Sequence, residues 1–194
     1  MKRKIDLLEG PIISTLARLA FPVMGTSLIQ MGYNLVDMIW IGRLGSNAVA
    51  AVGAAGMFMW FANGLTTIPR IGGQVNIGQS LGAERTEAAA EYARGALRMG
   101  AFLGILYGII SVVFHRQLID FFMLNSPKVI QDARVYLLIT CGLVVFSFLD
   151  QVLGGILAAM GNTVTTFRVT TIGLVLNLVL DPLLIFGIGP ISRL

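Results

Sequence analysis

Two aspartates interrupt long apolar stretches of this sequence, one in YNLVDMIWIGRLG (residues 33–45) and one in LNLVLDPLLIFG (residues 176–187). A charged side chain at the centre of a membrane helix costs about 2.5–3.5 kcal/mol on insertion scales, so such carboxylates are candidates for a functional site. Asp37 comes six residues before Arg43, and Asp181 comes six residues before Gly187. At a rise of about 1.5 Å per residue, both acids would lie roughly 9 Å from the same end of two co-directional helices.

Amide and hydroxyl side chains accompany both acids at the spacing of one helix face. The stripe that contains the first acid consists of Gln30, Tyr33, Asn34 and Asp37. In the second stretch Asn177 precedes Asp181 by four residues, which again places the two side chains on one face. A set of oxygen ligands of this kind suits a hard cation such as Na⁺, or a proton. The spacing therefore predicts one cation site shared by two helices.

Other polar residues within apolar stretches are harder to assign. Asp150 and Gln151 would lie in the opposite half of the membrane from the two acids, where Asp150 either lines the same cavity at another depth or pairs locally. Arg70 shares a helix face with Thr66 and Gln74. We interpret Arg70 as a residue that neutralises a buried acid.

The composition of the chain is that of an integral membrane protein. Of its 194 residues 56% are hydrophobic and only 12% are charged, and the mean hydropathy is +0.81. The net charge of +4 would suit a nucleic-acid partner, but the basic residues are scattered at the ends of apolar runs, where they act as topology signals. Cys141 is the single cysteine, so the sequence predicts no disulfide framework.

Because a span needs about 20 apolar residues, five transmembrane helices are predicted to position these side chains. Their expected ranges are 16–41, 48–81, 96–114, 136–160 and 167–186. The connections are too short for a separate domain, so we expect an all-α membrane bundle and one transmembrane domain over residues 1–194.

More lysine and arginine lie on the side of the membrane where the N-terminus is placed, which predicts that the N-terminus of this cell-membrane protein is cytoplasmic. Gly100, Gly104 and Gly108 predict a surface for close helix packing.

Three stretches give the chain a specific family resemblance: YNLVDMIWIGRLGSNAVAAVG (33–53), GQSLGA (78–83) and LNLVLDPLLIFGIGP (176–190). They resemble the multidrug and toxic compound extrusion (MATE) transporters. The resemblance implies a fold of twelve helices in two lobes, of which this chain would supply the first five helices of the N-terminal lobe. It also implies export of drugs and organic cations across the lipid bilayer in exchange for Na⁺ or H⁺.

The resemblance further implies which residues take part. Asp37, Asn177 and Asp181 match the cation site of the N-terminal lobe, and Tyr33 and Asn34 match the stretch beside its first acid. Asp150 and Gln151 match polar cavity positions of the fourth helix. The stretch TIPRIGGQ (67–74) departs from the small-residue pattern expected in the second helix, because it contains Arg70. No cofactor is implied besides the coupling ion.

Other functions remain possible on the sequence. A flippase for lipids or lipid-linked sugars would share this helix arrangement, and only Arg70 favours the basic cavity that it needs. An intramembrane aspartyl protease using Asp37 and Asp181 is disfavoured, because the GxGD pattern is absent. Walker-type and CxxC motifs are also absent, so an enzyme is not expected. Finally, five helices cannot form two lobes, so the isolated chain is expected to be inactive without a C-terminal lobe or a complementary half.

Overall fold

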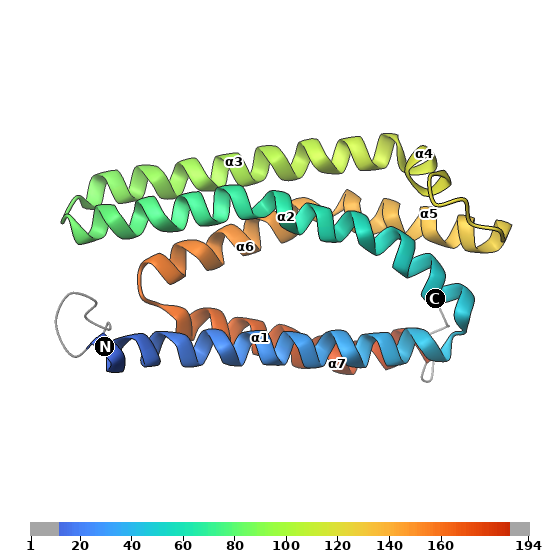
Figure 1. Cartoon of the computed structure of the whole chain (residues 1–194), viewed down its shortest axis with the longest axis horizontal. Coiled ribbons are helices and arrows are strands. Elements are labelled where there is room, and N and C mark those ends of the chain that lie inside the picture. The colour runs from blue at the N-terminus through green and yellow to red at the C-terminus, as the bar shows by residue number, and fades with distance from the viewer. Residues whose placement is uncertain (1–11, 187–194) are drawn as a thin grey trace. The chain divides into compact units, whose positions relative to one another are not determined.

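The computed structural model describes residues 12–186 of the chain, and helices joined by short turns account for nearly all of them (Figure 1). The helices are α1 (Ile12–Arg43), α2 (Ser46–Gly82), α3 (Thr86–Val113), α4 (His115–Asp120), α5 (Pro127–Gly142), α6 (Val144–Ala159) and α7 (Thr163–Phe186). No β-strand occurs within this part of the chain. The predicted all-α fold is confirmed.

Several of these helices are long and apolar enough to cross a membrane. They are α2, α3 and the segment Thr163–Asp181 of α7, and the pair α5 and α6 makes a fourth span if its two parts are counted together. Helix α1, with 32 residues, also has the necessary length and is as apolar on average as α2 and α3. The predicted membrane bundle is confirmed, and three or four of the five expected spans are found among the described residues.

The structure corrects two of the predicted helix boundaries. Helix α3 begins at Thr86 rather than near residue 96, because TEAAAEYARG is rich in alanine and glutamate, which favour helix. The expected span 136–160 is broken at Leu143 into α5 and α6, which meet at an angle of 46°. Helix α5 also extends back to Pro127, which occupies its first turn, where proline is well tolerated.

The contacts of the chain divide it into two compact units, and the predicted single domain over residues 1–194 stays a prediction. In the first unit α1 packs against α7, and the two helices run in the same direction (Figure 1). They approach closely at Gly25, where a Cβ atom would lie 2.9 Å from Cε2 of Phe167. This parallel pair carries the predicted cation site.

The second unit contains α2, α3, α4, α5 and α6. Helix α2 packs against α3, α5 and α6, and the Tyr107 hydroxyl of α3 donates a hydrogen bond of 2.7 Å to the Phe58 carbonyl of α2. Its buried core is built from small and aliphatic side chains: Ala51, Ala55, Ile119, Val129, Ala133, Leu137 and Cys141. At the surface of the unit, Arg134 of α5 forms an ion pair of 2.5 Å with Asp120 of α4.

Glycines on α3 allow this second unit to pack closely. Gly100, Gly104 and Gly108 are all buried. A Cβ atom at Gly104 would lie 3.0 Å from Cα of Val145, and one at Gly108 would lie 3.0 Å from the Cys141 carbonyl oxygen. The predicted packing surface is therefore confirmed, and its partners are α6 and the end of α5.

Candidate functional site

The predicted cation site brings together side chains from α1 and α7 in the first unit. The Asn177 amide, oriented so that its nitrogen faces its neighbours, donates to both the Tyr33 hydroxyl and the Asp181 carboxylate. The nitrogen lies 2.6 Å from the Tyr33 oxygen and 3.0 Å from Oδ2 of Asp181. Tyr33 and Asn177, which this contact joins, each precede a predicted acid by four residues on two parallel helices (Figure 1).

Asp37 belongs to the same region of the first unit. It lies one helical turn beyond Tyr33 on α1, and its negative charge is close enough to interact with that of Asp181. The side chains of Tyr33, Asp37, Asn177 and Asp181 are all half-buried. The structure thus brings both predicted acids and the predicted amide into one polar cluster between two helices.

A cavity of about 250 Å³ lies beside this cluster in the first unit. It is lined by Gln30, Tyr33, Thr170, Gly173, Leu174 and Asn177. Thr170, Gly173 and Leu174 are absent from the sequence prediction. Their spacing could have identified them, because positions 170, 174, 177 and 181 follow one face of α7 toward the acid.

Some predicted residues lie away from these features. Asn34 is exposed and does not line the cavity beside Gln30 and Tyr33. Asp150 is exposed in the second unit. Within residues 12–186 no three His, Cys, Asp or Glu side chains form a metal-binding group, so a cation on α1 and α7 would also need the amide and hydroxyl oxygens.

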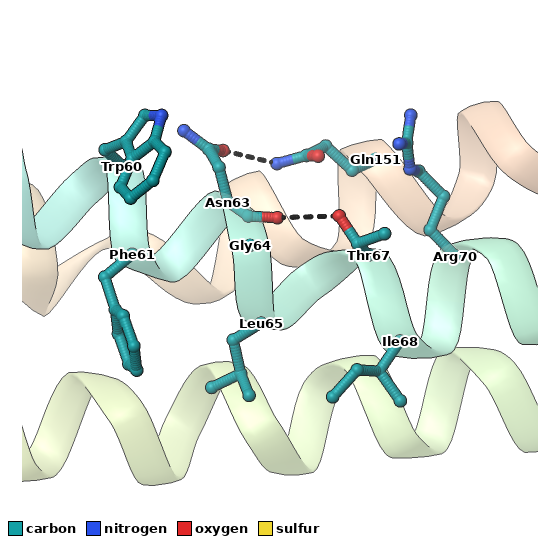
Figure 2. A pocket seen from close by; sticks show the side chains of 9 residues that line it. All are labelled: Trp60, Phe61, Asn63, Gly64, Leu65, Thr67, Ile68, Arg70 and Gln151. Carbon is teal, nitrogen blue, oxygen red and sulfur yellow. Dashed lines mark hydrogen bonds between the residues drawn. The ribbon is translucent and has the colours of Figure 1, made fainter.

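The second unit contains a larger cavity, of about 540 Å³, between α2 and α6 (Figure 2). Its lining residues are Trp60, Phe61, Asn63, Gly64, Leu65, Thr67, Ile68, Arg70 and Gln151. Gln151 of α6 donates a hydrogen bond of 2.7 Å to the Asn63 side chain of α2. Arg70 and Gln151 are therefore brought together as cavity residues, whereas Trp60 and Asn63 were not predicted.

The surroundings of Arg70 differ from the predicted neutralising role. In the described part of the chain no carboxylate lies close enough to form an ion pair with Arg70. Its Nε atom is buried and makes no hydrogen bond there. The aliphatic part of the side chain lies against α6, where a Cβ atom at Gly155 would come within 2.9 Å of Cγ of Arg70.

The family model described as MatE matches residues 22–183 of the chain. A FAD transporter of Shewanella oneidensis is 28% identical over 196 aligned positions, which cover 100% of this chain and 43% of the relative. A protein of Agrobacterium fabrum, described as the probable multidrug resistance protein NorM, is 29% identical over 87% of this chain and 36% of its own length.

Solved structures agree with these matches. The outward-facing conformation of a MATE family multidrug resistance transporter superposes with a TM-score of 0.90 at 26% identity, covering 97% of this chain and 42% of that chain. A MOP superfamily transporter from Pyrococcus furiosus superposes with a TM-score of 0.89 at 26% identity and the same coverage. The chain thus spans less than half the length of the curated relatives that it matches.

Proposed function

Since the chain belongs to the MatE family of membrane transporters, we propose that it supplies the N-terminal lobe of a cation-coupled antiporter. This lobe would work with a second lobe to export drugs or organic cations in exchange for Na⁺ or H⁺ across the cell membrane. Its N-terminus would lie in the cytoplasm. The contact of the Asn177 amide with Tyr33 and Asp181 is the observation that carries the proposal.

The amide can act as the moving part of a cation site. With its nitrogen toward Tyr33 and Asp181, Asn177 satisfies both acceptors by donating hydrogen bonds. Rotation of the Asn177 amide by half a turn would instead point its oxygen toward Tyr33 and Asp181. Oxygen atoms of three side chains would then face one another. A cation would coordinate these converging oxygens, whereas without it the Tyr33 hydroxyl is the one group among them that can donate a hydrogen bond. Asp37, whose charge interacts with that of Asp181, would supply the second carboxylate.

Ion binding to the purified chain in lipid nanodiscs tests this proposal. If Na⁺ is the coupling ion, radioactive sodium binds to the wild type, and Asp37→Asn and Asp181→Asn each abolish the binding. If the proton is the coupling ion, an apolar carbodiimide labels a protonated carboxyl group, and the same variants reduce the labelling.

Asp132→Asn is the matched control, because Asp132 is an exposed carboxylate on α5 outside the first unit. It should retain wild-type ion binding or labelling. Sodium binding and carbodiimide labelling both absent from the wild type, or unchanged in the two site variants, would refute the cation site.

Arg70 favours a second candidate function, the flipping of lipids with anionic headgroups. The cavity between α2 and α6 presents a guanidinium group without an acidic partner in the described residues, and such a group attracts phosphate. Translocation of a fluorescent anionic phospholipid by reconstituted protein, without export of a cationic dye, would favour this candidate over drug export.

A further inference from the structure

The cavity between α2 and α6 has the size and the chemistry of a small-molecule site. Its volume of about 540 Å³ lies within the range of about 300–1,000 Å³ that is typical of ligand pockets. Trp60, Asn63, Thr67 and Arg70 follow one another at intervals of three or four residues, which places them along one side of α2. Figure 2 shows Trp60, Asn63, Gln151 and Arg70 on the side of α2 away from α3.

Arg70 gives one end of this cavity a strong preference for negative charge. A buried N–H group without an acceptor is unfavourable, and the Nε atom of Arg70 is such a group among the described residues. Within residues 12–186 no carboxylate forms an ion pair with the guanidinium group. The planar guanidinium binds carboxylate or phosphate through paired hydrogen bonds. The close approach of Gly155 to Cγ of Arg70 holds the stem of the side chain against α6, so its direction is restricted before a ligand binds.

The opposite end of the cavity suits a flat ring. Trp60 is 78% exposed although it is a large aromatic side chain, and it lines the cavity ten residues before Arg70. Ten residues of helix correspond to a rise of about 15 Å between the two backbone positions, and a ligand has to bridge only the part of this distance that the two long side chains leave open. Between the ends, the hydrogen-bonded pair of Asn63 and Gln151 offers polar atoms to the middle of such a ligand.

We propose that the α2/α6 cavity binds aromatic compounds that carry a carboxylate or phosphate group. The ring stacks on Trp60, and the acidic group binds the guanidinium of Arg70. This inference rests on the proposed export function for its biological role. Among the drugs that the proposed transporter would export, it assigns to this cavity the aromatic acids, including zwitterions.

A pair of dyes with one ring system and opposite charges tests the proposal directly. Fluorescein and rhodamine 123 share the xanthene ring, but fluorescein is an anion and rhodamine 123 is a cation at pH 8. Binding to the full chain in neutral detergent is followed by fluorescence anisotropy at equilibrium, without any ion gradient. We expect saturable binding of fluorescein to the wild type, and its absence would overturn the proposal.

Two variants address the two parts of the cavity separately. Arg70→Gln removes the charge and should weaken fluorescein binding about tenfold or more, because a hydrogen bond to a charged group is lost. Gly64→Leu fills the cavity without a clash, since no atom lies within 4 Å of the Cβ position at Gly64. It should also weaken fluorescein binding about tenfold, although every polar group remains. Fluorescein binding unchanged in either folded variant would overturn the proposal.

Each variant has a matched control outside the cavity. Arg98→Gln removes an exposed arginine from α3, and Gly53→Leu adds a side chain to α2 at another position with open space around its Cβ atom. Both controls should bind fluorescein within about twofold of the wild type, since neither changes a cavity contact. If Arg70→Gln fails to fold, Arg70→Lys retains the charge without the planar fork, and its weaker fluorescein binding would support the same assignment.

A short-chain lipid distinguishes an aromatic acid from a lipid headgroup as the ligand. Dihexanoyl phosphatidylglycerol carries a phosphate but no ring, so it should not displace fluorescein at equal concentration. Displacement would overturn the aromatic part of the proposal and favour lipid flipping instead. None of these measurements uses Asp37 or Asp181. The dye measurements therefore test the α2/α6 cavity independently of the cation site, and either proposal can be refuted while the other is supported.

Discussion

The Asn177 amide lies between acceptors from two helices, the Tyr33 hydroxyl of α1 and the Asp181 carboxylate of α7. In the proposed cycle its two orientations correspond to an ion-free and an ion-bound site. An amide suits this exchange, since it carries a donor and an acceptor on one rotatable group. The residue that senses the ion is then Asn177, although the two aspartates supply the charge.

Tyr33→Phe tests the contribution of the hydroxyl group at the residue scale. It removes one of the two acceptors that the Asn177 amide contacts and leaves the ring in place. In the proposed ion-bound site the Tyr33 oxygen is one of the converging ligands. Losing one such interaction costs about 1–1.5 kcal/mol, so the affinity for the coupling ion should fall about tenfold in equilibrium binding. Tyr92→Phe on α3, where Tyr92 is exposed, should leave the affinity unchanged. An unchanged affinity in Tyr33→Phe would remove Tyr33 from the site.

Local spacing was sufficient to predict part of the candidate sites. Asp37, Asn177 and Asp181 could be identified because a carboxylate in an apolar helix is costly and because the polar neighbours follow a helical period. Trp60 and Asn63 could not be identified in this way. Their role depends on the packing of α2 against α6, and no pattern within α2 shows which helix will lie beside it.

At the scale of helices, the close contact of α3 with α6 and the end of α5 depends on glycines in α3, which have no side chain to separate the backbones. A Cβ atom at Gly104 would lie 3.0 Å from Cα of Val145 and 3.2 Å from Cβ of Phe148. In a membrane, where apolar lipid surrounds the helices, such close packing is a main source of helix association. The glycines of α3 thus support the second unit, and with it the cavity that α2 and α6 form.

Gly104→Ala should therefore destabilise the protein even though alanine favours helix. Overpacking costs about 1–3 kcal/mol, so the apparent melting temperature in detergent should fall by several degrees. Gly95→Ala on the same helix is the control, because no atom lies within 4 Å of its Cβ position. That variant should be as stable as the wild type or more so. Equal melting temperatures for both variants would contradict the close packing at Gly104.

The sequence also shows which parts of a helix architecture are predictable. The apolar runs predicted α2 and α7 to within a few residues, because each run is long and ends at turn residues. The break at Leu143 was not predicted, since a single glycine such as Gly142 is tolerated inside many helices. The valines that follow it, Val144 and Val145, add to the low helix propensity of this stretch and help to explain the break.

At the scale of the molecule, the chain spans less than half the length of the relatives that it matches. Alternating access requires one bundle to move against another around a binding site. We therefore expect the 194-residue chain to bind ion and dye, but to export no dye from proteoliposomes under a sodium or proton gradient. Co-reconstitution with a complementary lobe should restore export. Gradient-driven export by the chain alone would show that one lobe, or several copies of it, is sufficient.

The pairing of α1 with α7 has a consequence for biosynthesis. Asp181 follows Asp37 by 144 residues (181 minus 37), so the first acid enters the bilayer long before the asparagine and aspartate of α7 have been translated. At about 5–20 residues per second the interval lasts about 7–29 s. During that time α1 has none of its final neighbours from α7. The insertion machinery must therefore accommodate the polar residues of α1 in the membrane until α7, which carries the other residues of the ion site, has been translated.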